Sequence, residues 1–353
     1  MDKIRVGIIF GGRSGEHEIS LMSATSVINA MDKEKYSLSF FGITKTGRWM
    51  SYRGPVENIE SGKWEETAED YNMGDLKKDV DFALPVLHGP YGEDGTIQGL
   101  FEMLDIPYAG CGVLASALAM DKAVAKEIFA RAGLPVCKHV LLYREDLEDE
   151  EGQLSQKAVE KQAQDAMKEL KYPVFVKPAN MGSSVGISKA RDDESLAKAI
   201  MEAAKYDRRI LVEEGINARE VETGVIGNHH PEAAEVGEIL PSAEFYDYHA
   251  KYFDGGESKL CIPAPLSQEK REEIRDIAVR AYMALDCAGF SRVDFFIDKD
   301  TDKVYINEIN TIPGFTKFSM FPLLWQAAGV PYGKLIERII GFGYEKYKAK
   351  NKR

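Results

Sequence analysis

Asp294, Glu308 and Asn310 have the side-chain types and spacing expected of metal ligands. They lie in two short motifs, Arg-Val-Asp at 292–294 and Asn-Glu-Ile-Asn-Thr-Ile-Pro-Gly at 307–314. Carboxylate and amide groups offer hard oxygen ligands, and magnesium takes one or two carboxylates while leaving its other positions to water or nucleotide phosphate. The two motifs together predict a magnesium site.

A hairpin would bring these motifs together. Residues 290–297 and 304–309 are rich in β-branched and aromatic residues, and the segment 298–302 between them is a polar turn. Side chains alternate along a strand, so Arg292 and Asp294 are expected on one face of the first strand. Glu308 and Asn310 are expected on one face of the second strand, so that the hairpin has one polar, oxygen-rich face. A polar face that only meets solvent is the alternative, because such alternation is common on antiparallel sheets.

A second candidate site follows the predicted strand at 172–178, which ends in Lys177-Pro. The next residues, Ala-Asn-Met-Gly-Ser-Ser-Val-Gly at 179–186, form a loop rich in glycine and serine. Backbone N–H groups of such a loop can surround phosphate oxygens, serine hydroxyls add donors, and lysine adds a positive charge. The alternative is an ordinary flexible loop tip, since Gly/Ser clusters mark loops in general.

The first part of the chain predicts a parallel sheet. A buried-type strand at 4–10 is followed by a glycine loop and a helix that runs to Met31, and further strands are expected at 36–44 and 81–87. Strands that alternate with helices imply a parallel sheet with ligands at the carboxyl ends of its strands. Residues 57–78 are acidic and poorly periodic, and they predict a surface excursion.

The glycine loop leaves several functions open. Gly11, Gly12 and Gly15 do not have the G-x-G-x-x-G spacing of a dinucleotide site, so a dehydrogenase is the weaker interpretation. Glu16 could bind an ammonium group, or it could only favour the start of the following helix. His88, at the end of a strand, suits either a structural or a catalytic role.

The middle of the chain predicts a mostly antiparallel sheet. One helix is expected over 113–132, and Gly133-Leu-Pro135 ends it. Strands at 138–143, 172–178 and 209–214 are expected to form the sheet, and strands at 220–226 and 235–239 to complete it. The long aromatic loop at 245–253 is a candidate lid. We therefore divide the chain into domains at 1–134, 135–240 and 241–353.

Composition narrows the class of protein. The 353 residues suffice for two or three domains, and 44% of them are hydrophobic. No apolar run is long enough for a membrane span or a signal peptide, so we expect a cytoplasmic protein. A net charge of −12 argues against nucleic-acid binding. The four cysteines are widely spaced, which favours buried thiols over a zinc site or disulfides.

Taken in order, these motifs resemble the D-alanine–D-alanine ligases of the ATP-grasp superfamily over nearly the whole chain. One family signature resembles residues 88–99, His-Gly-x-x-Gly-Glu-Asp-Gly-x-Ile-Gln-Gly, and another resembles the pair of motifs at 292–294 and 307–314. Gly-Ser-Ser-Val-Gly at 182–186 and Tyr-Asp-Tyr-x-Ala-Lys-Tyr at 246–252 add two more. The resemblance implies an α/β (α+β) ATP-grasp fold with an N-terminal parallel α/β domain, a central antiparallel α+β domain and a C-terminal α+β domain.

The resemblance also assigns roles around ATP. It implies that Asp294, Glu308 and Asn310 hold two magnesium ions, with manganese as an alternative, and that Glu308 bridges them. It further implies that Lys122, Lys177 and Lys251 bind the phosphates and that Ser183 and Ser184 lie in a loop that covers them. Glu213 and Glu214 are implied to bind the adenine, and Glu220 the ribose.

For the amino-acid substrates, the resemblance places Glu16 against the ammonium of the first D-alanine, in a group with Ser183 and Tyr252. His88 lies near the first substrate, and Ser319 meets the carboxylate of the second. Arg292 and the backbone N–H of Gly314 form the oxyanion site. These implied roles complete the set of expected substrate contacts.

The implied reaction joins two D-alanines at the expense of ATP for peptidoglycan precursor synthesis, and the family is homodimeric. The implied partners are thus ATP and D-alanine, with no nucleic acid and no membrane. D-serine or D-lactate as the second substrate is the alternative within the same chemistry. An ATP-binding regulator without turnover is the alternative from another class, and the metal triad with Arg292 argues against it.

Overall fold

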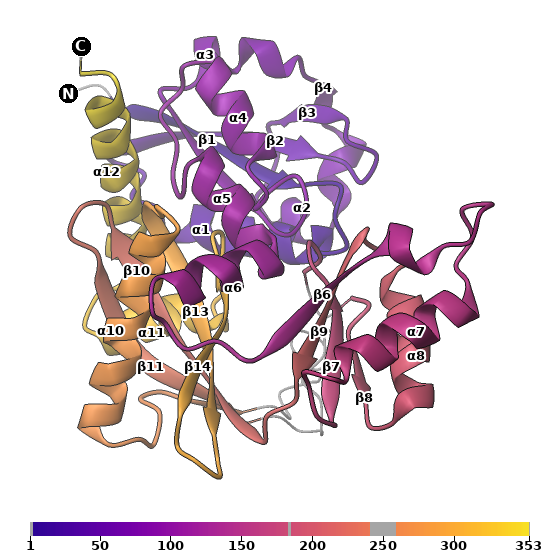
Figure 1. Ribbon diagram of the computed structural model, residues 1–353. Helices are drawn as coiled ribbons and strands as arrows, with labels where there is room; N and C mark the ends of the chain where they lie inside the picture. Colours follow the sequence, from indigo (N-terminus) through magenta and orange to yellow (C-terminus); the bar gives the residue numbers. More distant parts are fainter. Residues whose placement is uncertain (1–2, 183–184, 241–258, 353) are drawn as a thin grey trace.

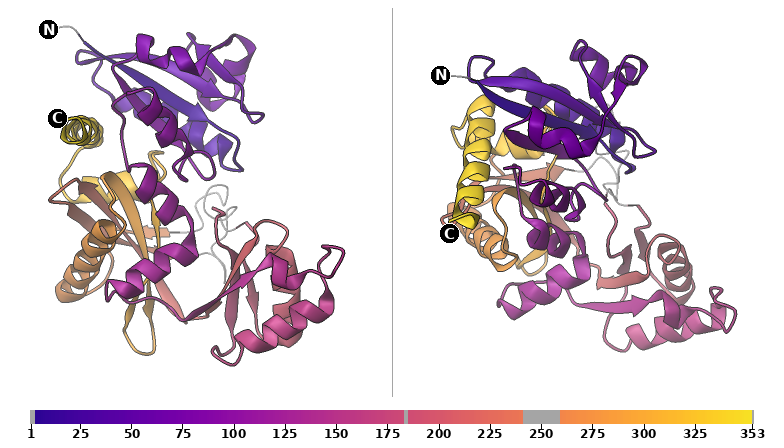
Figure 2. Two further views of the ribbon diagram at one scale, coloured as in Figure 1. Left: turned by 45° about the horizontal axis from the view of Figure 1, so that its top comes forward. Right: turned by 90° about the horizontal axis from the view of Figure 1, so that it is seen from above.

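The computed structural model describes residues 3–182, 185–240 and 259–352, and the strands of these residues form three sheets (Figure 1). The first sheet belongs to the amino-terminal part, the second to the middle, and the third mainly to the carboxyl-terminal part. Figure 2 shows them in three separate parts of the molecule. The mixed α/β fold expected from the sequence is confirmed.

The first sheet has the strand order β4-β3-β2-β1-β5. Its strands are β1 (Ile4–Gly11), β2 (Tyr36–Ile43), β3 (Trp49–Tyr52), β4 (Glu69–Asp70) and β5 (Phe82–Leu87). The parallel arrangement is confirmed for β1, β2 and β5, whereas the antiparallel strands β3 and β4 extend one edge. Helices α1 (His17–Ala30), α3 (Leu76–Asp79) and α4 (Thr96–Met103) accompany this sheet.

The surface excursion expected at 57–78 is wrong in part. The segment forms α2 (Glu57–Glu60), η1 (Lys63–Glu66) and η2 (Met73–Asp75), and Ile59 and Trp64 are fully buried. The Trp64 ring packs edge-on against Phe10 of β1, with 5.1 Å between the ring centroids. A few large apolar side chains therefore anchor an otherwise acidic segment to the core.

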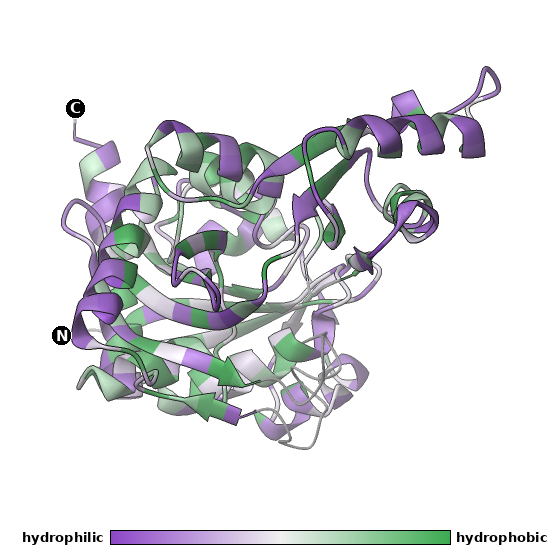
Figure 3. Cartoon of the chain, turned by 60° about the horizontal axis from the view of Figure 1, so that its bottom comes forward, coloured by the Kyte–Doolittle hydropathy of each residue, from purple (hydrophilic) through white to green (hydrophobic). Residues whose placement is uncertain are grey.

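The second sheet has the order β6-β9-β7-β8 and is antiparallel. Its strands are β6 (His139–Tyr143), β7 (Val174–Pro178), β8 (Ser188–Ala190) and β9 (Arg209–Glu214), and its helices are η3 (Arg144–Leu147), α7 (Gln156–Ala166) and α8 (Asp193–Ala203). Val159, Ala163 and Ala166 of α7 face the core at helical spacing. The outer turns of this helix are mostly hydrophilic (Figure 3, upper right).

The third sheet, β12-β11-β10-β13-β14, corrects the expected strand membership. The strand predicted at 220–226 pairs with the first strand of the predicted hairpin, and the strand predicted at 235–239 pairs with the strand at 220–226, so neither belongs to the second sheet. The elements of this sheet and its helices are β10 (Ala218–Gly227), β11 (Glu232–Leu240), β12 (Lys259–Cys261), β13 (Gly289–Asp298), β14 (Val304–Asn310), α10 (Gln268–Ala284), α11 (Met320–Ala327) and α12 (Tyr332–Lys350).

The single helix expected over 113–132 is two helices, α5 (Val113–Met120) and α6 (Lys122–Arg131). Asp121 between them has an extended backbone, and its carboxylate accepts hydrogen bonds from the N–H groups of Ala123 and Val124. A side chain that caps the first turn favours a new helix start over continuation. The break places Lys122 at the beginning of α6.

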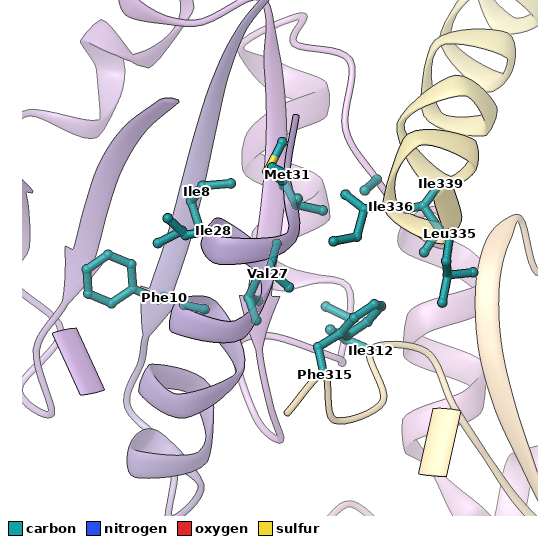
Figure 4. Close-up of a cluster of buried hydrophobic side chains, with 14 of the residues drawn as sticks. Ile8, Phe10, Val27, Ile28, Met31, Ile312, Phe315, Leu335, Ile336 and Ile339 are labelled. Atoms are coloured by element: carbon teal, nitrogen blue, oxygen red, sulfur yellow. The ribbon is translucent and has the colours of Figure 1, made fainter. Parts of the chain in front are cut away.

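Both ends of the chain meet in one hydrophobic core (Figure 4). Helix α12 packs beside α1 and the first sheet, and the loop after β14 contributes Ile312 and Phe315 to the same cluster. Phe315 also lies 5.3 Å from Phe321 of α11, between ring centroids. The loop that follows the metal motif is thereby fixed between the amino-terminal and carboxyl-terminal parts.

No helix among residues 3–182, 185–240 and 259–352 is long and apolar enough to cross a membrane.

Leu335→Ala tests the shared core. Leu335 is fully buried on α12, so we expect the free energy of unfolding to fall by about 2 to 5 kcal/mol, the range for truncation of a buried leucine. The same substitution at Leu114, whose side chain is 59% exposed, is the matched control and should change stability by less than about 0.5 kcal/mol. Urea unfolding followed by circular dichroism measures both; equal effects would contradict the packing of α12.

Candidate active site

A cavity of about 1120 Å³ opens between the second and third sheets, with loops of the first sheet at one end. Carboxylates and lysines from all three parts of the chain line it, together with apolar side chains such as Phe175 and Met120. The lining includes these predicted site residues: Glu16, Lys122, Lys177, Glu213, Glu214, Glu220, Asp294, Glu308 and Asn310. Residues far apart in sequence therefore meet at one site.

The predicted hairpin is confirmed as β13 and β14, with Asp294 opposite Glu308 and Arg292 opposite Asn310. A shift of register follows Asp294, and it leaves Asn307 as an extra residue. Such a bulge changes which side chains share a face. As a result Asn307 and Glu308 both line the cavity, while Ile306 and Ile309 on either side of them stay buried in the core.

Arg292 and Asp294 form a buried ion pair on the hairpin. The guanidinium donates from Nε to Asp294 Oδ1 at 2.7 Å and from a terminal nitrogen to Oδ2 at 2.6 Å. Asn310 Nδ2 donates to the same Asp294 oxygen at 3.0 Å, and Glu222 Oε2 lies 2.8 Å from Arg292 Nε. The alternative of a purely solvated face is therefore wrong, because Arg292, Asp294 and Glu222 are all at least nine-tenths buried.

Glu222 was missed in the sequence, although it lies two residues after Glu220 on β10 and so shares its face. It pairs in register with Asp294 on the neighbouring strand. The buried guanidinium is thus placed between two carboxylates, Glu222 and Asp294. Their charges compensate the cost of burying Arg292.

A second ionic cluster joins α6 to the second sheet. Glu213 Oε2 lies 2.5 Å from Lys177 Nζ, and its other oxygen contacts Lys126 Nζ. Burial alone would raise the pKa of Glu213, but the two lysines outweigh it and lower the pKa to about 2. Lys126, which was also missed, lies one helical turn after Lys122.

Lysines also connect the two sheets across the cavity. Lys177 Nζ donates to Asn307 Oδ1 at 3.4 Å. Burial would lower the pKa of Lys177, but the negative charge of Glu213 outweighs this effect and raises the pKa. Lys122 Nζ donates to the Met181 carbonyl at 2.7 Å and lies 3.3 Å from Glu308 Oε2. Both ammonium groups are therefore held beside side-chain oxygens of the hairpin, at Asn307 and Glu308.

Glu16 and Glu93 form a carboxylate pair at the amino-terminal end of the cavity. A β-carbon added at Gly89 or at Gly182 would come within 2.8 Å of Glu16 Oε2, so both loops approach this carboxylate closely. Glu93 accepts hydrogen bonds from Gly89 N at 2.8 Å and Ile312 N at 3.1 Å. Burial and the nearby Glu16 nevertheless raise the pKa of Glu93 to about 8.

Glu93 belongs to the signature at 88–99 but was given no role from the sequence. Two other predicted residues, His88 and Ser319, are not among the described residues that line the cavity. Both ring nitrogens of the buried His88 face protein groups, and Ser319 Oγ lies 2.8 Å from Thr316 Oγ1. Arg292 and Gly314 are likewise not among the lining residues in the described part of the chain. The predicted residues Ser183, Ser184, Lys251 and Tyr252 lie outside the described residues.

Comparison with protein families gives two adjoining matches. Residues 5–111 match the family described as D-ala D-ala ligase N-terminus, and residues 128–341 match D-ala D-ala ligase C-terminus. D-alanine–D-alanine ligases of Thermoanaerobacter sp. (strain X514) and Ruminiclostridium cellulolyticum are 51% and 50% identical to this chain. The first alignment covers 99% of both chains; the second covers 98% of this chain and 97% of the relative.

Solved structures agree with these matches. The D-alanine-D-alanine ligase from Coxiella burnetii superposes with a TM-score of 0.85 at 32% identity, over 100% of this chain and 97% of that one. The VanG D-Ala:D-Ser ligase from Enterococcus faecalis superposes with a TM-score of 0.84 at 36% identity, over 97% of this chain and 100% of that one. The chain therefore belongs to the D-alanine–D-alanine ligase family, which comprises ATP-dependent ligases of the ATP-grasp fold.

Proposed function

We propose that this protein joins two molecules of D-alanine into D-alanyl-D-alanine for peptidoglycan precursor synthesis, with conversion of ATP to ADP and phosphate. The observation that supports this most directly is the cavity, in which Asp294, Glu308 and Asn310 lie beside Lys122 and Lys177. Oxygen ligands and lysines in one place suit a nucleotide triphosphate with its metal.

The side chains of the hairpin fit magnesium. Two carboxylates and one amide oxygen donor face a cavity that has room for phosphates and water, which is the donor set magnesium accepts. Asp294, Glu308 and Asn310 would hold the ions, with Glu308 shared between two of them, and manganese would fit the same ligands. When bound, the metal neutralises charge on the phosphoryl group that is transferred.

The remaining lining residues divide naturally around ATP. Lys122 and Lys177 would contact the phosphates. By the family resemblance Ser183, Ser184 and Lys251, which lie outside the described residues, would add donors to them. Glu213 and Glu214 at the end of β9 would take the adenine amine and ring edge, and Glu220 the ribose hydroxyls. The ion pairs of Glu213 keep it ionised at neutral pH, so it can only accept hydrogen bonds.

The chemistry needs an activated carboxylate, because oxide is a poor leaving group. The carboxylate of the first D-alanine, held through its ammonium by Glu16 with His88, Ser183 and Tyr252 nearby, would attack the terminal phosphorus of ATP. The amine of the second D-alanine, with its carboxylate at Ser319, would then attack the carbonyl of D-alanyl phosphate. Arg292 and the Gly314 N–H would donate to the resulting oxyanion, where one donor is commonly worth about 2.7 to 4 kcal/mol.

The proposed function and its nearest alternative differ in the second substrate, which is D-alanine in the proposed reaction and D-serine or D-lactate in the alternative. The likeness to the VanG D-Ala:D-Ser ligase keeps D-serine, and with it D-lactate, as a second candidate acceptor. A homodimer is a further proposal, which sedimentation velocity would test.

Parallel turnover assays test the proposed acceptor. ATP with D-alanine alone should give one ADP per D-alanyl-D-alanine, and addition of D-serine or D-lactate should yield little mixed product by mass spectrometry. L-alanine should give no turnover. Predominant D-alanyl-D-serine or D-alanyl-D-lactate would instead favour the second candidate, and ATP binding without any turnover would favour a regulator.

Tyr252→Phe is expected to weaken the preference for D-alanine in the same assays.

Glu308→Gln tests the metal site. The amide keeps the size of the side chain but removes the charge that bridges the proposed ions, so ADP formation should fall by at least about 100-fold. Glu169→Gln, at an exposed position just after α7 and outside the cavity lining, makes the same chemical change and should leave ADP formation unaffected. Circular dichroism should show both variants folded. Near-normal ADP formation by folded Glu308→Gln would remove the proposed role.

A further inference from the structure

The loop at 311–315 is tied to the amino-terminal part by hydrogen bonds on both sides of Gly314. On one side, the Ile312 carbonyl lies 2.9 Å from His88 Nδ1. On the other, the Phe315 N–H donates to Ser23 Oγ at 3.2 Å. Ser23 Oγ in turn lies 3.1 Å from His88 Nε2, so the two contacts form one connected set.

The partners fix the direction of each hydrogen bond. A carbonyl can only accept, so His88 Nδ1 carries the proton and donates to Ile312. In the neutral imidazole Nε2 is then an acceptor, and the Ser23 hydroxyl donates to it. The serine oxygen keeps lone pairs for the Phe315 N–H. Ser23 and His88 together therefore hold the carbonyl before Pro313-Gly314 and the N–H after it.

The surroundings make this connection rigid. Ser23 is fully buried on α1, and His88 is buried at the end of β5. The Ser14 hydroxyl donates to the His88 carbonyl at 2.6 Å, and the Ile312 N–H donates to Glu93. Buried hydrogen bonds of this kind are costly to leave unmade. The position of the loop is therefore set by the first sheet and not by its own hairpin alone.

We propose that Ser23 is a positioning residue for the oxyanion donor at Gly314. This inference rests on the proposed function, in which the Gly314 N–H binds the oxyanion formed when the second amine attacks the acyl phosphate. Ser23 touches neither substrate nor ATP in this account. It acts through Phe315 and His88, and its loss should affect the second chemical step more than the first.

The two steps can be separated by the ratio of ADP to dipeptide. In the wild type, one ADP accompanies each dipeptide. When the oxyanion donor is displaced, D-alanyl phosphate forms at a nearly normal rate but reacts more slowly with the amine, and water hydrolyses part of it to D-alanine and phosphate. We expect Ser23→Ala to slow dipeptide formation by about tenfold or more, since small displacements of reacting groups have effects of this size. ADP formation should fall much less.

Ser20→Ala is the matched control. Ser20 is equally buried on the same helix, but its hydroxyl donates to the Val86 carbonyl and accepts from the Gly11 N–H, away from the 311–315 loop. The Ser20→Ala variant should be less stable than the wild type, but its ratio of ADP to dipeptide should be unchanged. If Ser23→Ala does not fold, Ser23→Cys replaces it, because a thiol fills similar space and hydrogen-bonds weakly.

The outcomes are distinct. An ADP-to-dipeptide ratio that rises in Ser23→Ala or Ser23→Cys and stays at one in Ser20→Ala supports the proposal. Equal losses of ADP and dipeptide in the Ser23 variants, with the ratio unchanged, would overturn it and leave Ser23 a purely structural residue. Absence of D-alanine-dependent ADP formation in the wild type would instead contradict the proposed function itself.

Discussion

The site depends on the mutual neutralisation of buried charges. In the described part of the cavity region, Arg292 pairs with Asp294, and Glu213 is held between two lysines. A buried charge without a partner would be strongly unfavourable, so each group must find one in the folded protein. Lys177, Glu213 and Asp294 of these groups line the cavity, so the ion pairs fix charged side chains at its wall.

The three sheets give each set of groups a separate support. The second sheet carries Lys177 and Glu213, the third carries Asp294 and Glu308, and the first supplies Glu16 from the loop after β1. Helix α12 returns to the first sheet and completes one core with α1 and the 311–315 loop. The 311–315 loop, the β13–β14 hairpin and the end of the cavity at Glu16 are therefore connected through packed elements. Reacting groups from different sheets can be held at defined distances in this way.

Much of this arrangement could be predicted from local pattern. Alternation placed Arg292 and Asp294 on one strand face, and the order of the motifs indicated the family and its fold. The bulge at Asn307 was not predictable, because it depends on cross-strand register. The membership of β10 and β11 in the sheet of the hairpin also depends on long-range contacts, which a strand's own residues do not specify. Asp121 carries a local signal of the break between α5 and α6, because it is a capping side chain within an apparently continuous helix.

The residues that support the site are the least predictable from the sequence. Glu222 lies two residues after Glu220 on the same strand, and Lys126 lies one helical turn after Lys122. The periodicity of strand and helix therefore indicates both residues. Ser23 gave no such signal: its contact with Phe315 joins positions 292 residues apart, and one serine within an apolar helix face resembles many others. Domain boundaries at 134 and 240 stay a prediction, although sheet membership already changes after β9.

In the proposed reaction, the first D-alanine is activated through its own carboxylate by phosphoryl transfer. The most direct measurement uses D-alanine with ¹⁸O in the carboxylate, ATP and magnesium, followed by mass spectrometry of the released phosphate. Attack by that carboxylate and later loss of phosphate transfer one ¹⁸O atom into each phosphate formed with a dipeptide. Phosphate without ¹⁸O, at normal dipeptide yield, would show that the carboxylate oxygen never bonds to phosphorus and would contradict the account.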